Sequence, residues 1–348
     1  MASLCCRNLL FRGSTVVHRS TRHLWSAASS SKSRYLEIDG MRLPFRKLKQ
    51  STDADLITLL DELVRPTRRK TGKAILEGRR LISDAIYAKV PLEAVLFTEM
   101  KHIQGLPLVP GDPALIHVHQ TQLERWSSVK TAPGALAIIH VAEPGVLVDE
   151  ASASNSMKIP FYAILDNVTD PTNLGSVVRV LAAAACGGIL VTQGCCDAWC
   201  GAALRGGMGA HFRIPIKSHV DWNSIPSLLP PDSAVFLLES TAFDQIPLTG
   251  SVDESLVEER IVDGTELAQL SYNEPKYVAH SPVVLIIGGS VQQGLSVQAR
   301  ILAEEMGGLR LSIPIQPQSP VALHPVAAAS IVAFEIRKQF LSDSRQAQ

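Results

Sequence analysis

The chain has 348 residues, of which 46% are hydrophobic and 19% are charged. This composition is typical of a globular protein and excludes an intrinsically disordered chain. The length is sufficient for a large core and favours two domains. No uninterrupted apolar run approaches the roughly 20 residues that are needed to cross a bilayer, so a membrane-spanning protein is not expected.

The 33 basic and 33 acidic residues balance in number, but they are unevenly spread along the chain. The first acidic residue is Glu37, and the serine-rich segment before it holds six basic residues: Arg7, Arg12, Arg19, Arg22, Lys32 and Arg34. A start that is poor in acid and rich in arginine and serine is typical of a mitochondrial transit peptide, although a plain basic tail is the alternative. We therefore expect residues 1–40 to be a leader and the protein to lie in the mitochondrial matrix.

Residues 41–145 show the pattern of a small α/β domain. A helical repeat in "DADLITLLDELV" (53–64) is followed by alternating strand and helix patterns. Strands are expected at 74–76, 92–98, 114–119 and 134–144, and a helix at 81–86. Small polar residues in "DEASASNSMKIP" (149–160) then indicate a linker.

A dense basic cluster lies in the stretch "RPTRRKTGKAILEGRR" (65–80) of this first domain. Such a concentration of Lys and Arg suits contacts with the phosphate backbone of a nucleic acid, although a solvated helix face would look similar. We expect RNA to bind there through Arg68, Arg69, Lys70, Lys73, Arg79 and Arg80.

Residues 155–343 indicate a second α/β domain. Strands are expected at 161–167, 187–192, 211–216, 234–240 and 283–289 and within the first part of 309–335, and helices at 174–185 and 325–341. Alternating strands and helices favour a parallel sheet, and the apolar run "VVLIIGG" (283–289) suits a strand that is buried on both faces. The acidic stretch 244–282 is expected to be a surface excursion without chemistry.

The stretch "DNVTDPTNLGSVVRVLAAA" (166–184) joins polar turn residues to an alanine-rich helix and contains no obvious nucleophile. Asn173 lies at or beside the expected N-cap, where its side chain can accept a backbone N–H. Gly175 permits close approach of another backbone or of a ligand. Arg179 follows Asn173 by less than two helical turns. Taken alone, a capping Asn and a solvated Arg would explain these features.

Two later stretches also join a strand to a turn or loop. In "VVLIIGGSVQQGLS" (283–296) a buried strand runs into a glycine-rich turn, and ligands bind at such strand ends in α/β proteins. The glycines do not form GxGxxG, so no dinucleotide fingerprint is present. In "LRLSIPIQPQSPVALHPVAAASIVAFE" (309–335) a strand, a proline-spaced loop and an apolar helix follow one another. His324 is the only titratable side chain of that loop, and a structural role suits it as well as a chemical one.

The cysteines do not suggest a metal site. Outside the expected leader there are four: Cys186, Cys195, Cys196 and Cys200. The stretch "GCCDAWCG" (194–201) has no second Cys or His pair at the spacing of a zinc site. Buried free thiols are the simpler interpretation, and we expect no metal.

In this order and at these spacings, the three stretches resemble the three motifs of the SpoU-type RNA ribose 2′-O-methyltransferases. The resemblance covers roughly 155–343, with 244–282 excepted, and the first domain resembles the substrate-binding domain of this family. It implies a trefoil-knotted parallel-sheet methyltransferase domain preceded by a small α/β RNA-binding domain. Such a knot is a rare exception to the rule that protein chains are unknotted. It also implies that S-adenosylmethionine binds in the knot and that the protein acts as a homodimer.

The resemblance further implies residue roles and a substrate. Asn173 would help to orient the target 2′-hydroxyl, and Arg179 would activate it and bind nearby phosphate. The substrate would be the ribose of a guanosine in mitochondrial large-subunit rRNA, without help from a metal or a covalent nucleophile. The backbone positions implied to contact the cofactor are those of Gly288, Gly289, Ile313 and Leu323.

The chain departs from the family pattern in its second and third motifs. Ser290 and Val291 stand where the family usually carries an acid after the glycines. The stretch 322–324 reads Ala-Leu-His where the family usually has Ser-Leu-Asn. A catalytically weak or inactive RNA-binding or ribosome-assembly factor on the same fold is therefore the alternative function, because a fold does not guarantee its site.

Overall fold

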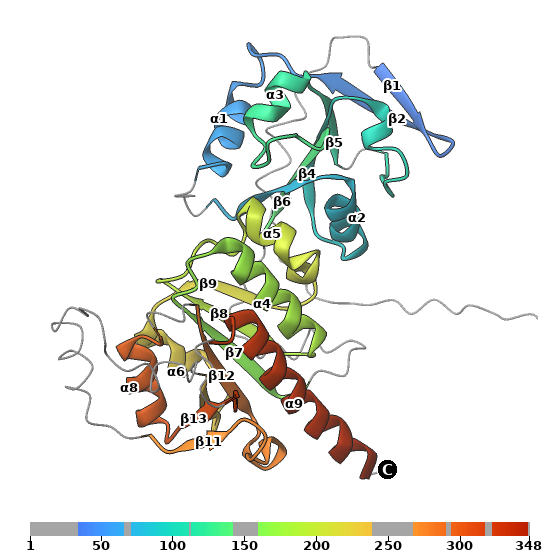
Figure 1. The fold of residues 1–348 in the computed structure, drawn as a ribbon. Helices are drawn as coiled ribbons and strands as arrows, with labels where there is room; N and C mark the ends of the chain where they lie inside the picture. The colour runs from blue at the N-terminus through green and yellow to red at the C-terminus, as the bar shows by residue number, and fades with distance from the viewer. Residues whose placement is uncertain are drawn as a thin grey trace, which may run out of the picture. The chain divides into compact units, whose positions relative to one another are not determined.

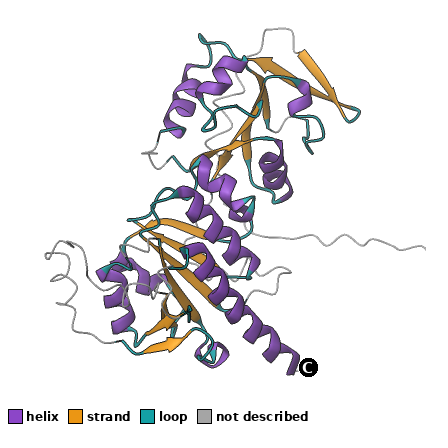
Figure 2. Cartoon of the chain, viewed as in Figure 1, coloured by secondary structure: helices purple, strands orange, loops and turns teal. Residues whose placement is uncertain are grey.

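The computed structural model describes residues 34–65, 71–110, 113–141, 159–238, 267–289, 294–316 and 322–346. Strands and helices of these ranges form two sheets with helices packed on them, which confirms the expected α/β class (Figures 1 and 2). No helix of the described ranges is both long enough and apolar enough to pass through a bilayer.

The first sheet has the strand order β1-β2-β5-β4-β6-β3. Its strands are β1 (Arg34–Ile38), β2 (Met41–Lys47), β3 (Lys73–Glu77), β4 (Leu92–Phe97), β5 (Ala114–His117) and β6 (Ala135–His140). The helices beside it are α1 (Ala54–Leu63), α2 (Arg79–Tyr87) and α3 (Gln120–Arg125). The sheet is mixed, because β5 runs parallel to β2 and β4 whereas β6 runs antiparallel to β3 and β4.

Strand β1 begins inside the segment that was expected to be a leader. Its Leu36 and Ile38 are 6% and 2% exposed, so both side chains belong to the core of the first domain. Strand β1 therefore overlaps the last residues of the expected leader, whose residues 1–33 lie outside the described ranges, so the leader itself stays a prediction.

The second sheet has the strand order β11-β13-β10-β12-β7-β8-β9, and every neighbouring pair is parallel. Its strands are β7 (Phe161–Asp166), β8 (Gly188–Thr192), β9 (Ile216–Val220), β10 (Ala234–Leu238), β11 (Gln269–Ser271), β12 (Val283–Gly288) and β13 (Leu309–Ser312). The helices are α4 (Pro171–Ala183), α5 (Gly201–Gly207), α6 (Ile225–Leu228), α8 (Val297–Glu305) and α9 (Pro325–Gln346). The predicted parallel sheet is confirmed, whereas its knot stays a prediction.

Both faces of the central strands are covered, as the apolar run of β12 predicts. Leu165 and Leu285 belong to the cluster that includes the buried sides of α4 and α9. Ile164 and Ile286 point to the other face, where they pack with residues of α6 and α8. Because successive side chains of a strand alternate between faces, a strand covered on both sides has no polar positions.

One predicted strand of this domain is wrong, and one short strand was not predicted. The stretch 211–216 was expected to be a strand, but Ala210–Phe212 form a 3-10 turn and β9 begins only at Ile216. Pro215 has no N–H for a sheet ladder, which disfavours a strand through it. The stretch 244–282 was expected to be a surface excursion, and the short strand β11 within it, which pairs with β13, was not predicted.

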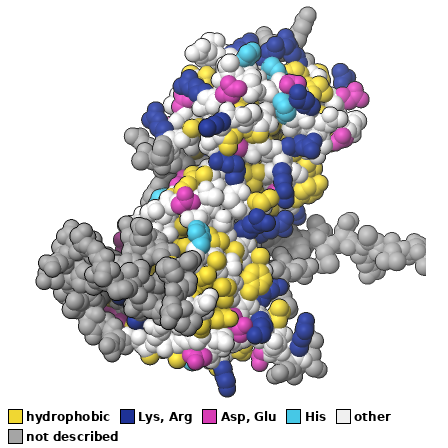
Figure 3. Space-filling view, in the orientation of Figure 1, with side chains coloured by type: hydrophobic (Ala, Val, Ile, Leu, Met, Phe, Trp, Pro, Cys, Tyr) yellow, Lys and Arg dark blue, Asp and Glu magenta, His cyan; other side chains and the backbone are white. Residues whose placement is uncertain are grey.

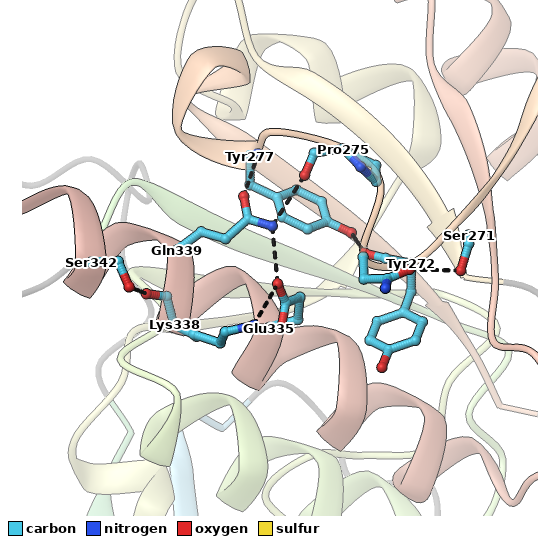
Figure 4. Close-up of polar contacts among 9 residues, drawn as sticks. Ser271, Tyr272, Pro275, Tyr277, Glu335, Lys338, Gln339 and Ser342 are labelled. Atoms are coloured by element: carbon cyan, nitrogen blue, oxygen red, sulfur yellow. Dashed lines mark hydrogen bonds and ion pairs between the residues drawn. The ribbon is translucent and has the colours of Figure 1, made fainter.

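A polar network fastens the residues after β11 to α9 (Figure 4). The Gln339 side chain accepts the backbone N–H of Tyr277 at 2.9 Å and donates to the carbonyl of Pro275 at 3.1 Å. Tyr277, whose side chain is buried, donates its hydroxyl to the carbonyl of Tyr272. Glu335 accepts from the Gln339 amide and pairs with Lys338 on the same helix. The network fixes α9, which starts directly after the loop of the third motif.

The start of β1 generates a prediction about truncation. A chain without residues 1–33 should keep the stability of the full chain, because no described contact is lost. A chain without residues 1–40 should lose roughly 3–6 kcal/mol in its free energy of unfolding, since Leu36 and Ile38 leave the core. Urea unfolding of both chains measures the difference, and equal midpoints would show that β1 is not part of the stable domain.

Candidate active site

The loop from Asp166 to Asp170 leads from β7 into α4. Asp170 is the N-cap, and its carboxylate accepts the backbone N–H of Asn173 at 2.7 Å. Pro171 occupies the first helical position, where its missing N–H costs nothing. The expectation that the Asn173 side chain caps the helix is therefore wrong, because Asn173 lies three residues inside. No other described residue forms a hydrogen bond with its side-chain amide, which is thus available to a ligand.

Gly175 brings two helices together. A Cβ at this position would lie 2.1 Å from the carbonyl oxygen of Ala203 in α5, which is far inside van der Waals contact. Gly206 faces the same contact from α5, where a Cβ would lie 2.9 Å from the carbonyl oxygen of Thr172. Of the two explanations for Gly175, approach of a backbone and approach of a ligand, the structure shows the first.

Arg179 is exposed on α4 and contacts the end of α5. Its Nη1 donates to the sulfur of Met208 at 3.1 Å. Met208 follows the last residue of α5 and has a left-handed backbone conformation with a φ of 46°. This C-cap turns the chain so that the Met208 side chain reaches Arg179. A thioether is a weak acceptor, so the guanidinium keeps most of its capacity to donate to a ligand.

Met208 also lines a cavity of about 280 Å³. The cavity lies between the start of α2 and the end of α5, and its lining residues are Glu77, Gly78, Arg79, Arg80, Leu81, Asp84, Leu204, Arg205 and Met208. Two residues predicted to bind RNA, Arg79 and Arg80, thus share a cavity with the side chain that contacts the predicted catalytic Arg179. The sequence alone placed these groups about 100 residues apart.

Arg205 is a cavity residue that the sequence analysis missed. Its Nη1 lies 3.2 Å from the Glu77 carboxylate and 2.5 Å from the Ser128 hydroxyl. The Glu77 side chain is only 4% exposed and also accepts from Ser127 and Ser128. Arg205 and Glu77 are 128 residues apart in the chain, so no local pattern could have paired them.

Lys73, which was also predicted to bind RNA, does not line this cavity. The Lys73 ammonium group lies 2.6 Å from the carboxylate of Glu93, and both side chains are mostly buried. This ion pair argues against a contact between Lys73 and phosphate. Arg68, Arg69 and Lys70 lie outside the described residues, so their assignment stays a prediction.

Gly288 and Gly289 end β12 beside the start of the α4 loop. Gly288 pairs in register with Asp166, and the N–H of Gly289 donates to the carbonyl of Asp166 at 2.9 Å. A Cβ on Gly289 would lie 2.3 Å from the carbonyl oxygen of Asn167 and equally close to the Cα of Val168. A side chain at position 289 would collide with the backbone of Asn167 and Val168, so this close backbone packing by itself explains the glycine.

The predicted third-motif residues flank the loop before α9. Ile313 directly follows β13 and is buried, whereas Leu323 is half-buried against the same core. Strands β12 and β13 run in the same direction on either side of β10, so Gly288 and Ile313 lie at the same edge of the sheet. His324 accepts the N–H of Val326 through its Nδ1 at 3.2 Å, which supports its structural interpretation.

The cysteine thiols are protonated at neutral pH. Burial raises the pKa of Cys186 and of Cys196 to about 12. Cys195 donates to the carbonyl of Leu165 at 3.1 Å, and burial raises its pKa as well. A thiol that donates to the backbone acts as a small packing group, in agreement with the interpretation as free thiols.

Comparisons with known proteins show which proteins this chain resembles in sequence and in fold. The sequence of the SpoU rRNA Methylase family matches residues 160–319. The mitochondrial rRNA methyltransferase 3 of Mus musculus is 34% identical over 296 residues, which are 79% of this chain and 69% of that protein. The Homo sapiens protein of the same name is also 34% identical, over 79% of this chain and 70% of its own length.

A solved structure has the same fold. The AdoMet-bound rRNA methyltransferase from Sinorhizobium meliloti superposes with a TM-score of 0.60 at 21% identity, and the match covers 84% of this chain and 97% of that one. The family match spans β7 to the loop after β13. The chain belongs to the SpoU rRNA methylase family.

Proposed function

We propose that this protein transfers a methyl group from S-adenosylmethionine to the 2′-hydroxyl of a guanosine ribose in mitochondrial large-subunit rRNA. The relatives named mitochondrial rRNA methyltransferase 3 support rRNA and the mitochondrion. A more distant relative from Bacillus subtilis, 26% identical, is named a 23S rRNA guanosine 2′-O-methyltransferase, which supports the nucleoside and the position of the methyl group. The expected leader, which carries no acidic residue before Glu37, supports import into the matrix.

The cavity beside Met208 is the observation that carries this proposal. It places the cations Arg79, Arg80 and Arg205 next to the side chain that Arg179 contacts. Guanidinium groups bind phosphate through paired N–H donors, so a strand of RNA that contacts the cavity would pass close to Arg179. RNA binding and catalysis would then share one surface.

The chemistry requires little of the protein beyond alignment. The cofactor, when bound, supplies a methyl group on a cationic sulfur, which is already electrophilic. The 2′-oxygen would accept this methyl group, and its hydroxyl proton would leave to solvent, so the site residues would have only to align the two groups. Arg179 would stabilise the negative charge that develops on the oxygen, because its guanidinium presents several N–H donors to it. Asn173 would orient the hydroxyl with its uncommitted amide.

The residues at the edge of the second sheet suit the cofactor. The backbone groups of Gly288, Gly289, Ile313 and Leu323 would hold it. The apolar side chains of Ile313 and Leu323 suit an adenine ring. Asp166, paired in register with Gly288, has a buried carboxylate oxygen without a partner among the described residues, which suits a cationic ligand.

A homodimer is part of the proposal. Hydrophobic side chains gather on the face over α4 and α9 in the space-filling view (Figure 3). Phe334 of α9 is 47% exposed, which is uncommon for a large aromatic side chain. Exposed apolar patches mark interaction sites, and a second copy would cover this one.

Replacement of Arg179 tests the catalytic role. Arg179→Ala should reduce methyl transfer at least about a hundredfold, because the charge that stabilises the reacting oxygen is lost. Its folding and its affinity for S-adenosylmethionine should not change, since the side chain is exposed and its hydrogen bond within the described residues is a weak one to Met208. Transfer of labelled methyl to mitochondrial rRNA measures the rate, and calorimetry measures the affinity.

Arg213→Ala is the matched control, because Arg213 is an exposed arginine of the same domain. Full activity of the Arg179→Ala protein would remove Arg179 from the site. A native protein that binds RNA but neither binds S-adenosylmethionine nor methylates RNA would favour the alternative assembly factor, to which the changes at Ser290, Ala322 and His324 point.

The cavity predicts a specific salt dependence of RNA binding. Arg79→Ala/Arg80→Ala should flatten the plot of log affinity against log salt by up to about 1.5 in slope, since roughly two phosphate contacts are lost. The control Lys89→Ala/Lys101→Ala removes the same charge from exposed positions of the same domain outside the cavity. Filter binding at several salt concentrations compares the two, and equal slopes would exclude the cavity as the phosphate site.

A further inference from the structure

Two carboxylates line the cavity between α2 and α5, and they differ in what they contact. The Glu77 carboxylate accepts the N–H of Ser128 at 3.1 Å and the hydroxyl of Ser127 at 2.7 Å, and it pairs with Arg205. The Asp84 side chain is half-buried and forms no hydrogen bond or ion pair with any other described residue. Its carboxylate is therefore available to a hydrogen-bond donor that enters the cavity.

The turn at the end of α5 places this carboxylate beside Met208. Met208 and Gly209 both have left-handed backbone, with φ angles of 46° and 84°. A Cβ on Gly209 would lie 2.9 Å from Oδ2 of Asp84, so the backbone of Gly209 packs directly against the carboxylate. Met208, one residue earlier, accepts from Arg179 through its sulfur. The free carboxylate and the expected catalytic cation thus lie on either side of one short turn.

The other walls of the cavity suit a flat ring. Leu81 and Leu204 are buried apolar side chains, and Met208 offers a polarisable sulfur, which packs well against aromatic rings. The cavity volume of about 280 Å³ lies just below the roughly 300–1,000 Å³ of sites for drug-sized ligands. It therefore suits one small ring system. Proteins that recognise RNA by sequence usually bind single unstacked bases in this manner.

A carboxylate distinguishes guanine from the other bases. Both carboxylate oxygens can only accept hydrogen bonds. The Watson–Crick edge of guanine carries two neighbouring donors, the ring N1–H and the 2-amino group, which match the two oxygens. Adenine and cytosine each have a ring nitrogen with a lone pair beside their amino group, and uracil has a carbonyl on each side of its single N–H. Each of these three bases would place a lone pair against the carboxylate.

We propose that the cavity binds an unstacked guanine base of the substrate RNA and that Asp84 accepts both donors of its Watson–Crick edge. The inference rests on the RNA-binding part of the proposed function, because that part places RNA on this cavity. Arg79 and Arg80 bind the neighbouring phosphates, and the base lies close to the ribose that Arg179 contacts. The cavity is thereby the feature that selects a guanosine.

Three short RNAs test the proposal on the full-length protein. The first is an eight-nucleotide uridine RNA with one central guanosine, and the other two carry inosine or adenosine at that position. Inosine lacks only the 2-amino group of guanosine. We expect the native protein to bind the guanosine RNA about fivefold more tightly than the inosine RNA and at least about tenfold more tightly than the adenosine RNA. Fluorescence anisotropy at one fixed salt concentration measures the three affinities.

Two substitutions assign the preference to Asp84. Asp84→Ala should bind the three RNAs with affinities within about twofold of one another, because the acceptor is lost. Asp84→Asn has nearly the same size, and it should favour adenosine over guanosine, since an amide offers one acceptor and one donor. Asp55→Ala is the control, because it removes one negative charge from an exposed position of the same domain outside the cavity. It should keep the native preference, and thermal unfolding shows that each variant is folded.

The outcomes separate the base site from the proposed function. The proposal is wrong if the native protein binds the three RNAs equally, or if Asp84→Ala keeps the native preference for guanosine. Transfer of labelled methyl to mitochondrial rRNA is measured on the same native preparation. Transfer without a base preference would overturn the guanine site alone. A guanosine preference without any transfer would support the guanine site and overturn the proposed methyl transfer.

Discussion

The contact between the backbone of Gly289 and that of Asn167 and Val168 is the constraint on which the candidate site depends. A Cβ on Gly289 would lie 2.3 Å from two of these backbone atoms, and backbone cannot move aside as a flexible side chain can. The contact brings the end of β12 against the start of the α4 loop. The cap at Asp170 and the exposed Arg179 follow this contact along the same loop and helix, so their positions depend on it.

A second glycine permits a close backbone contact between two helices. At Gly175 the backbone of α4 touches that of α5, so the two helices have a fixed separation and register. The register places Met208, at the end of α5, within reach of Arg179. The position of the expected catalytic cation is therefore set by a glycine one turn earlier on its own helix. Side-chain chemistry at this site rests on close backbone packing.

The sequence predicted what depends on local pattern and missed what depends on distant contacts. Strand β12 was evident because both of its faces are apolar, and β11 was missed because three residues beside an acidic stretch give no such signal. The α4 cap was assigned to Asn173 although Asp170 precedes a proline, which is the stronger signal for a helix start.

For the candidate site, too, local motifs could be predicted and distant contacts could not. Arg79, Arg80 and Arg179 were chosen from their own motifs, but their shared neighbourhood depends on a contact between α4 and the end of α5. Arg205 could not be chosen, since its partner Glu77 is far away in the chain. Asp166 looked like an ordinary strand end, because the sequence does not show that Ser296 returns to it.

The charges of the cavity decide which cations are available to RNA. Its lining holds three arginines and two acids, Glu77 and Asp84, so the surplus is one positive charge. Glu77 is nearly buried and engages Arg205, and separating a buried pair would leave an uncompensated charge. Arg205 is therefore held in place as part of the cavity lining. Arg79 and Arg80 are exposed in the first turn of α2, where the helix dipole adds to their positive potential. Arg79 donates one N–H to the carbonyl of Gln104 at 3.1 Å, and its other guanidinium donors can still contact a phosphate.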